Sequence, residues 1–413
     1  MQKLPRHGAT VMRQTLSRFP GPVYVEAMTA DNPGEIMPVP LQGLIPSEQR
    51  VERAAGDFRR GAPVLIRAQT DGQSGLAVAA ETVRDGTLRA LAGIAGPASL
   101  ILTHARAATL KIRLYTAEFV SIPLAGNMNA AEIRAIADPA TDLDFPLKGP
   151  FEASRDAPLQ AAGAAVKLAK LAGLLPAAVL FPIADNARDR VRMDGGLSDV
   201  FASDISGFAD RAAETLQLVT RASVPLEGAE EAELAAFRPL NGGPEHYAIV
   251  IGAKSAPALA SPGPVLTRLH SECFTGDLLG SLKCDCGDQL RGAIQKIAKE
   301  GGGILLYLAQ EGRGIGLMNK LRAYRLQDEG FDTIEANQRL GFEADERLYD
   351  IAARMLRLLG YSKVRLLTNN PDKVRALQNA GIEVTERVPH SFPDNEHNRE
   401  YLRVKAEKGG HLL

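Results

Sequence analysis

The sequence is poor in the residues that mark several classes of protein. It contains three cysteines, no tryptophan and only 5% aromatic residues. Three cysteines cannot build the paired network of a disulfide-rich secreted protein, so we expect a reducing compartment, the cytoplasm. No apolar run reaches the roughly eighteen residues that cross a bilayer, so we expect no membrane association.

The chain also lacks an excess of charge of either sign. Its formal net charge of −1 provides no global field that would attract nucleic acid, so we expect no nucleic-acid partner. Any anionic ligand must therefore be held by a local cluster of basic groups. The N-terminal segment is basic, with Lys3, Arg6, Arg13 and Arg18, but it lacks the apolar core of a signal peptide. It is typical of a transit peptide or of an arm that contacts another subunit.

The length and composition predict a globular chain of two domains. The chain has 413 residues, of which 45% are hydrophobic and 23% charged. Helical and strand periodicities alternate along it, which predicts a mixed α/β (α+β) fold in which each domain has a mixed sheet with packed helices. We place an N-terminal extension at residues 1–46, a first domain at 47–220 and a second domain at 221–413.

The hydrophobic periodicity predicts individual elements in both domains. In the first we expect helices over residues 51–60, 130–137, 160–173 and 208–218, and strands over 63–66, 100–102, 111–114, 119–123 and 178–181. In the second we expect strands over 247–251, 265–269, 303–308 and 363–367, and helices over 289–298 and 317–327, from 342 and from 371. Residues 332–337 are typical of a polar connector.

All three cysteines lie in one short stretch, at Cys273, Cys284 and Cys286. Cys284 and Cys286 are two apart, so an extended backbone points both sulfurs to one side. Such a cluster is typical of a metal site. Three thiolates leave tetrahedral Zn²⁺ one open position, which a catalytic zinc needs to activate water. The alternatives are a structural zinc, with His270 or a distant side chain as fourth ligand, and a disulfide with one free thiol.

A glycine-rich loop follows the strand at 303–308. Gly312, Gly314 and Gly316 lie within five residues and open the next helix. Such a loop lets backbone N–H groups approach an anion, and Arg313 and the helix dipole add to the attraction. Tyr324 lies on that helix, where it has an alternative explanation as an ordinary amphipathic residue.

Two later helix starts carry further polar groups. Asp345 has a structural explanation as a cap, but Arg347 in the same first turn suits a phosphate. The strand at 363–367 ends at Thr368, and Lys373 lies in the first turn of the following helix. Polar groups at the carboxyl end of a strand form a usual ligand rim in α/β proteins.

The motifs of the second half occur in a characteristic order. They are His270-Ser271-Glu272-Cys273, Lys283-Cys284-Asp285-Cys286-Gly287, Gln310-Glu311-Gly312-Arg313, Asp345-Glu346-Arg347 and Leu366-Leu367-Thr368-Asn369-Asn370-Pro371. In this order they resemble GTP cyclohydrolase II over about residues 240–413. The order of the two domains also resembles the fused bifunctional enzymes of riboflavin biosynthesis.

The resemblance implies hydrolytic opening of the guanine imidazole ring of GTP at C8. The products would be formate, pyrophosphate and 2,5-diamino-6-ribosylamino-4(3H)-pyrimidinone 5′-phosphate, in the first step of riboflavin biosynthesis. It implies one Zn²⁺ per chain on Cys273, Cys284 and Cys286, Mg²⁺ with the triphosphate, and a homodimer. The implied GTP-binding positions are Arg268, Leu269, His270, Ser271, Glu272, Gln289, Glu311, Gly312, Arg313, Thr333, Thr368 and Lys373.

The resemblance also implies three catalytic residues. Tyr324 would lie near the reacting ring, Asp345 would accept a proton, and Arg347 would act as a nucleophile toward the α-phosphate. For Arg347, stabilisation of phosphate charge is physically easier, because an arginine stays protonated in proteins.

The first half resembles 3,4-dihydroxy-2-butanone 4-phosphate synthase over about residues 47–205. Segments 56–66, 79–83, 135–139 and 168–174 carry the resemblance. That family holds Mg²⁺ in an acidic loop, where this chain has Asp71 as the one carboxylate, and the family's Gly-His-Thr-Glu is replaced by Gln160-Ala161-Ala162-Gly163. The resemblance therefore implies a fold that is retained without its catalytic groups. The alternative is an unrelated α/β domain.

Three other functions stay open. Zinc nucleobase deaminases also have a glutamate near cysteine ligands, as Glu272 stands beside Cys273 here. Their Pro-Cys-x-x-Cys motif is missing from this chain. A cyclohydrolase-like paralogue could act on another nucleotide, for example in pyrimidine catabolism. A non-enzymatic chain would use a structural zinc in a nucleotide-responsive scaffold.

Overall fold

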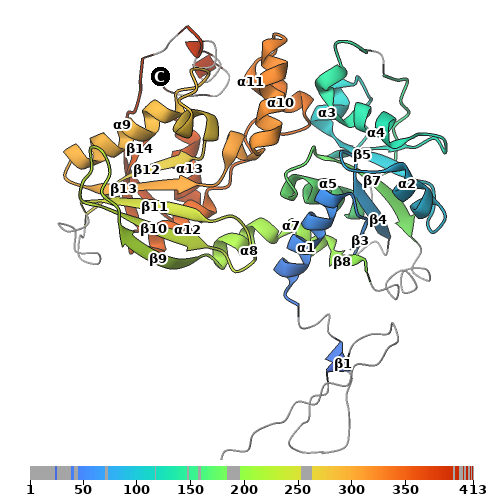
Figure 1. Cartoon of the computed structure of the whole chain (residues 1–413), viewed down its shortest axis with the longest axis horizontal. Coiled ribbons are helices and arrows are strands. Elements are labelled where there is room, and N and C mark those ends of the chain that lie inside the picture. Colours follow the sequence, from blue (N-terminus) through green and yellow to red (C-terminus); the bar gives the residue numbers. More distant parts are fainter. Residues whose placement is uncertain are drawn as a thin grey trace, which may run out of the picture.

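The computed structural model describes residues 45–69, 73–116, 118–146, 148–156, 160–183, 196–252, 263–393 and 396–399, with short pieces near both ends. The described residues form two large mixed sheets, each with packed helices, as the sequence predicted (Figure 1). Near the N-terminus β1 (Tyr24–Val25) and β2 (Val39–Pro40) pair antiparallel. Within the described ranges, no helix is both long enough and apolar enough to cross a membrane.

The first sheet has the strand order β6-β5-β7-β4-β3-β8, with β3 and β8 parallel and the other neighbours antiparallel. Its strands are β3 (Val64–Arg67), β4 (Ser74–Ala79), β5 (Ser99–Thr103), β6 (Phe119–Pro123), β7 (Ala177–Ile183) and β8 (Ser198–Phe201). Its helical segments are α1 (Ser47–Arg60), α2 (Asp85–Ala92), α3 (His104–Thr109), α4 (Ala130–Ala137), η2 (Pro139–Thr141), α5 (Gln160–Leu171), α7 (Ala202–Ser206) and α8 (Phe208–Glu214).

Local sequence explains how several of these elements begin and end. Helix α1 ends at Gly61, which adopts a left-handed φ of 72° that glycine tolerates without strain. Helix α4 begins with a capping box, in which the Asn129 side chain and the Glu132 side chain each accept a backbone N–H. These features confirm the helices predicted over residues 51–60 and 130–137.

Two predicted elements of the first half differ from the structure. The strand expected over residues 111–114 is absent, because Lys111 turns the chain after α3 with a φ of 58°. The helix expected over residues 208–218 ends at Glu214, because Gln217 already begins β9, which pairs with β10 in the second sheet.

The second sheet has the order β15-β14-β12-β13-β11-β10-β9. The four strands from β15 to β13 are parallel to one another, and the other three pair antiparallel. The strands are β9 (Gln217–Ser223), β10 (Ala232–Arg238), β11 (His246–Ile251), β12 (Val265–Ser271), β13 (Gly303–Leu308), β14 (Lys363–Leu367) and β15 (Glu383–Val388). The helical segments are η3 (Phe274–Leu278), α9 (Cys286–Lys299), η4 (Glu311–Gly314), α10 (Leu317–Asp328), α11 (Thr333–Arg339), α12 (Asp350–Leu358) and α13 (Pro371–Asn379).

Apolar side chains from both faces of the second sheet are buried, which fits strands that read as nearly continuous apolar runs. One face packs on α12 and α13, and the other packs on α9. The carboxyl ends of the neighbouring parallel strands β12, β13 and β14 therefore meet at one edge of the sheet, where the loops can hold a ligand.

Two predictions for the second half need correction. The sequence pattern favours a connector over residues 332–337, but Asp332 and Glu335 form a capping box that starts α11. The helix expected from residue 342 begins only at Asp350. Asp345 and Arg347 consequently lie in a non-helical segment before α12 and not in its first turn.

Candidate active site

One pocket collects nearly all of the predicted site residues at this sheet edge. The predicted residues that line it are Arg268, His270, Ser271, Glu272, Cys273, Cys284, Cys286, Gln289, Glu311, Gly312, Arg313, Tyr324, Thr333, Arg347, Thr368 and Lys373. Leu269 and Asp345 are not among its lining residues. The side chain of Leu269 is buried in the core, while its carbonyl oxygen accepts a hydrogen bond of 2.9 Å from Lys373 Nζ.

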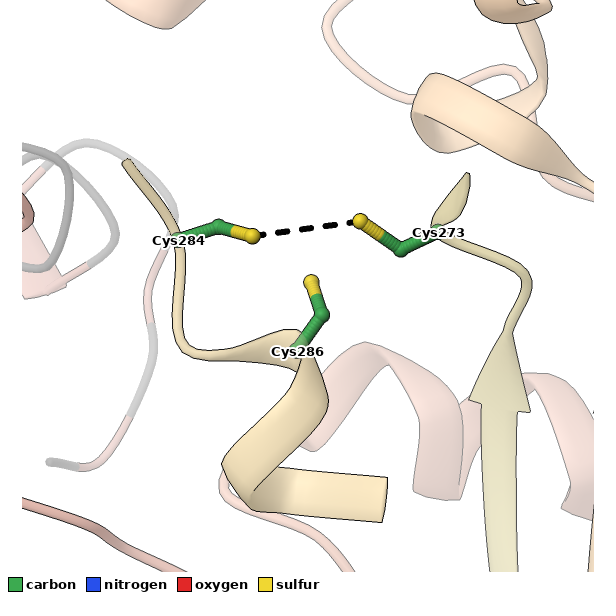
Figure 2. A group of neighbouring side chains, drawn as sticks. All are labelled: Cys273, Cys284 and Cys286. Carbon is green, nitrogen blue, oxygen red and sulfur yellow. Dashed lines mark hydrogen bonds between the residues drawn. The ribbon is translucent and has the colours of Figure 1, made fainter. Parts of the chain in front are cut away.

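The three thiols converge from separate elements (Figure 2). Cys273 follows β12, Cys284 lies in the loop after η3, and Cys286 is the first residue of α9. The sulfurs of Cys273 and Cys284 are 3.8 Å apart, and all three lie within 4.8 Å of one another. Tetrahedral zinc with Zn–S bonds of about 2.3 Å separates its sulfurs by about 3.8 Å, so this donor set fits zinc.

The structure gives His270 a partner other than the thiol cluster. Its Nε2 lies 3.1 Å from both carboxylate oxygens of Asp277. Among the described residues, the group that could hold a metal contains the three cysteines and no fourth ligand. The arrangement is therefore a three-ligand site, which is the donor count typical of catalytic zinc.

Gly276 lies against all three cysteines. A Cβ at this position would lie 2.8 Å from Cys284 Sγ, 2.9 Å from Cys286 Cβ and 3.0 Å from Cys273 Sγ. The Gly276 N–H also donates to Cys273 Sγ at 3.3 Å. The backbone thus forms one wall of the sulfur cluster at a distance that a side chain would prevent.

Asp277 organises the loop that carries Cys273. Its carboxylate accepts hydrogen bonds from the Cys273 backbone N–H at 3.0 Å and from the Tyr307 hydroxyl at 2.9 Å, besides its contact with His270. Burial lowers the pKa of His270, an effect that its bond to Asp277 only partly offsets, so the imidazole is neutral near pH 7. This buried network fixes the loop that carries Cys273.

Lys320 is a buried cation in direct contact with the thiol cluster. Its ammonium donates to Cys273 Sγ at 3.0 Å, to Thr275 Oγ1 at 2.9 Å and to Glu311 Oε1 at 2.9 Å. Burial alone would lower the pKa of Lys320, but the bonds to Glu311 and Cys273 outweigh it and raise that pKa. Hydrogen bonds from the other two thiols, and then from Lys320, lower the pKa of Cys273. Thiolate is the form that binds a metal.

A second group of polar residues lies across the strand ends. Arg268 donates to Leu367 O at 3.0 Å and to Gln289 Oε1 at 2.5 Å. Burial lowers the pKa of Arg268 to about 10, so its guanidinium is still charged at neutral pH. Lys373 lies nearby on α13, also buried. Together these residues place buried positive charge at the pocket wall.

The glycine-rich loop leads into a helix, as its sequence predicts. Gly312 and Arg313 both adopt left-handed φ values, of 63° and 62°, and α10 begins at Leu317. A left-handed arginine is strained, and such strain is characteristic of ligand loops. Glu311 fixes the loop to the cysteine segment, since its carboxylate accepts the Phe274 N–H at 2.6 Å and the Gly312 N–H at 2.9 Å.

Asp345 and Arg347 form a close ion pair. Arg347 donates through Nε and Nη2 to the two carboxylate oxygens, at 2.8 and 2.5 Å. Burial would raise the pKa of Asp345, but these bonds outweigh it and the pKa is lowered. The paired carboxylate is consequently a weak proton acceptor, and it holds the Arg347 guanidinium at the pocket wall.

Tyr324 lies over the thiol side of the pocket. Two ammonium groups lie near its ring centroid, that of Lys283 at 5.2 Å and that of Lys320 at 5.6 Å. Burial raises the pKa of Tyr324 to about 12, so the phenol keeps its proton and can donate a hydrogen bond to a ligand.

Sequence reasoning missed several residues of this site, and Gly276, Asp277 and Lys320 are those that contact the Cys273 segment directly. A weak signal existed for Lys320, which lies one helical turn before Tyr324 on the same face of the predicted helix. The roles of Gly276 and Asp277 depend on how η3 folds back on the cysteines, and no spacing rule predicts that.

Comparisons with known proteins bear on this site. The sequence profile of the family described as GTP cyclohydrolase II matches residues 217–389. GTP cyclohydrolase-2 from Azospirillum brasilense is 48% identical over 393 residues, covering 94% of this chain and 100% of the relative. The chain belongs to the GTP cyclohydrolase II family. It is accordingly an enzyme of this type, as the sequence motifs predicted.

Two further comparisons cover different shares of the chain. GTP cyclohydrolase-2 from Azotobacter vinelandii is 60% identical over 171 residues, which make up 41% of this chain and 80% of the relative. A two-domain 3,4-dihydroxy-2-butanone 4-phosphate synthase from A. baumannii is 19% identical, with a TM-score of 0.34, over 83% of this chain and 100% of that chain. At that score, the degenerate-synthase origin of the first domain stays an expectation.

Proposed function

We propose that this chain is a zinc-dependent GTP cyclohydrolase that opens the imidazole ring of GTP at C8. The products are formate, pyrophosphate and 2,5-diamino-6-ribosylamino-4(3H)-pyrimidinone 5′-phosphate, which makes this the first step of riboflavin biosynthesis. One observation carries the proposal: three converging thiols share a pocket with the cationic side chains of Arg268, Arg313, Arg347 and Lys373.

Cys273, Cys284 and Cys286 are the residues that would hold zinc. When bound there, zinc supplies Lewis acidity and lowers the pKa of water. The remaining chemistry belongs to the chain. Hydrolysis must break both bonds from C8 to the ring nitrogens and one phosphoanhydride bond, so base and triphosphate must be held at the same time.

We assign the strand-end and loop residues to this holding task. Arg268, Arg313 and Lys373 supply charge for phosphate oxygens, and the N–H groups of the Gly312 loop can approach them. Glu272 faces the thiol side of the pocket, and burial followed by the nearby Glu311 carboxylate raises its pKa. Following the resemblance, we assign Glu272 to contact the bound GTP.

The catalytic roles rest on the resemblance together with the geometry. Tyr324 keeps its proton and donates a hydrogen bond near the reacting ring. Arg347 stabilises phosphate charge, since a guanidinium that stays protonated is a poor nucleophile. We propose Asp345 as the proton acceptor, which requires that phosphate draws Arg347 away from it. Until then Asp345 positions Arg347.

Further expectations accompany this proposal. Mg²⁺ would arrive with the triphosphate, because the described residues provide no carboxylate cluster that could hold a divalent metal. A homodimer is expected, and light scattering on the purified protein tests it.

The experiment that tests the function follows formate release and pyrimidine absorbance after GTP is added with Zn²⁺ and Mg²⁺. We expect turnover, and we expect Cys284→Ser to abolish it. Absence of turnover with one bound zinc per chain would refute GTP as the substrate and favour another nucleotide. Full activity of Cys284→Ser would show that zinc is not catalytic.

We propose that the first domain is not catalytic. The segment that replaces the family's His and Glu forms the start of α5, where Gln160 accepts the Gln69 N–H at 3.1 Å. Asp71, the single carboxylate of the former acidic loop, lies outside the described residues. Incubation with ribulose 5-phosphate should give no dihydroxybutanone phosphate, and its formation would overturn this assignment.

A further inference from the structure

A segment of the second domain completes the core of the first. Figure 1 shows α10 and α11 standing between the two sheets. Their apolar side chains belong to the same buried cluster as one face of the first sheet, where β4, β5 and β7 contribute residues such as Val78, Leu100 and Val179. The contributing side chains from the second domain are Ile315, Ala323, Leu326, Ala336, Leu340 and Phe342.

Polar contacts along this interface are specific. Arg322 on α10 donates to both carboxylate oxygens of Glu81, at 2.6 and 3.3 Å. Glu81 is itself oriented by the Leu175 N–H, which donates to it at 2.8 Å. An arginine that binds both oxygens of a carboxylate, itself fixed by a further hydrogen bond, defines the distance and the angle between the two side chains.

Two more contacts hold the chain beyond α11. Thr103 Oγ1 donates to Gly341 O at 2.8 Å. A Cβ on Gly341 would lie 2.9 Å from Pro176 Cγ, so the backbone here approaches the first domain closely. Lys170 on α5 forms an ion pair of 2.5 Å with Glu346.

The same segment carries one wall of the pocket. On α10, Lys320 and Tyr324 face the thiols, whereas Arg322 and Leu326 face the first domain. Glu346, which is held by Lys170, lies between Asp345 and Arg347 in sequence, and its backbone N–H donates to Arg313 O at 3.0 Å. Residues 311–347 therefore connect the first domain directly to the pocket.

The described residues of the opposite wall pack within the second domain. The three cysteines, Arg268 and Lys373 lie on β12, α9, α13 and their adjoining loops, all packed within the second sheet's own layers. The A. vinelandii relative is also informative, because 171 matched residues make up 80% of it. A cyclohydrolase of this family can thus be about half as long as this chain.

We propose that the first domain now serves as a positioning device for the cyclohydrolase pocket, with Glu81, Thr103 and Lys170 as positioning residues. They hold residues 311–347 so that Lys320, Tyr324, Arg313 and Arg347 lie at the correct distance from the thiol wall. This role rests on the proposed GTP hydrolysis for its substrate. It predicts a specific signature, in which disturbing the interface weakens GTP binding while the three cysteines still take up one zinc per chain at saturating zinc.

The test uses substitutions confined to the first domain of the full-length protein. Glu81→Lys places a cation against Arg322, and Lys170→Glu places a carboxylate against Glu346. In the double variant we expect KM for GTP to rise about tenfold at unchanged zinc content. Hydrogen exchange should accelerate in peptides spanning residues 317–347. The matched control is Arg89→Glu, a charge reversal at an exposed position of α2, which should change none of these quantities.

A charge-swapped pair provides the second test. Glu81→Arg combined with Arg322→Glu restores attraction across the interface, so it should recover most of the lost affinity relative to Glu81→Arg alone. Two results for a folded Glu81→Lys/Lys170→Glu variant would overturn the proposal. One is an unchanged KM for GTP although hydrogen exchange of residues 317–347 has accelerated. The other is unchanged hydrogen exchange of these residues. If the wild-type protein fails to turn over GTP, the proposed function fails. Exchange of residues 317–347, with and without a bound nucleotide, still tests the positioning role.

Discussion

Substitution of Gly276 by alanine is expected to weaken zinc binding without unfolding the chain. The added methyl carbon would lie 2.8 Å from Cys284 Sγ and 3.0 Å from Cys273 Sγ, where ordinary contacts begin at about 3.4 Å. The backbone at Gly276 does not adopt a positive φ, so alanine brings no backbone strain there. Its cost is steric, and it falls on the two sulfurs and on Cys286 Cβ, which would lie 2.9 Å away.

The state that carries this cost determines what can be measured. Without metal, the thiols can rotate away from the methyl group at little expense, and only the contact with Cys286 Cβ remains. With zinc bound, three Zn–S bonds fix the sulfurs, and the clash must be relieved by moving the η3 loop. Overpacking of this kind costs about 1–3 kcal/mol. Because the sulfur contacts add their cost mainly to the metal-bound state, the zinc dissociation constant should rise about ten- to hundredfold.

The assay is competition for zinc against a chromophoric chelator, with melting of the metal-free protein as the check on folding. Gly280→Ala is the matched control, because Gly280 lies in the same excursion and a methyl group there would have no atom within 4 Å. Its φ of 66° introduces backbone strain instead of a clash with sulfur. Equal zinc affinities for wild type and Gly276→Ala would refute the reasoning, and so would equal losses in both variants.

Two further predictions concern charge. Lys320→Met should weaken zinc binding about tenfold, because it removes a charge-assisted hydrogen bond to Cys273 Sγ. Competition with a chelator measures the zinc affinity, and an unchanged affinity would contradict the prediction. Burial lowers the pKa of both His246 and His390 to about 4, below an ordinary value of 6.5. The unfolded chain therefore binds more protons between these values, and the free energy of unfolding should fall as pH falls from about 6.5 to 4, by at most about 3 kcal/mol per histidine. Urea unfolding across this range tests it, and a flat profile would contradict it.

The elements that the sequence predicted well are those with strong local signals. Gly61 ends α1 where a left-handed residue is needed, and residues 303–308 form β13 as a continuous apolar run bounded by glycine. The cysteine cluster was equally easy to recognise in the sequence, because all three thiols occur within fourteen residues and each sulfur can serve as a metal ligand.

The errors arose where tertiary contacts override local pattern. Residues 342–349 contain acidic groups that are typical of a helix start, yet Glu346 bonds to Lys170 and to Arg313 O instead of capping a helix. Similarly, residues 332–337 resemble a connector because the polar residues of α11 dominate its short sequence. Its buried Ala336 packs against the first domain. A short stretch of sequence around Ala336 does not include the residues of that contact.

The near-zero net charge of the chain is compatible with a triphosphate ligand, because charge acts locally. At physiological ionic strength, exposed charges are screened beyond about 8 Å, so distant carboxylates contribute little to the potential in the pocket. Arg268 and Lys373 are buried, where screening is weaker, and Arg313 and Arg347 line the same pocket. Three thiolates at the other wall would oppose an anion, but a divalent metal and the Lys320 ammonium offset them together. Removing either the metal or the Lys320 ammonium should therefore weaken nucleotide binding as well as metal-dependent catalysis. The two walls of the pocket are thus coupled electrostatically.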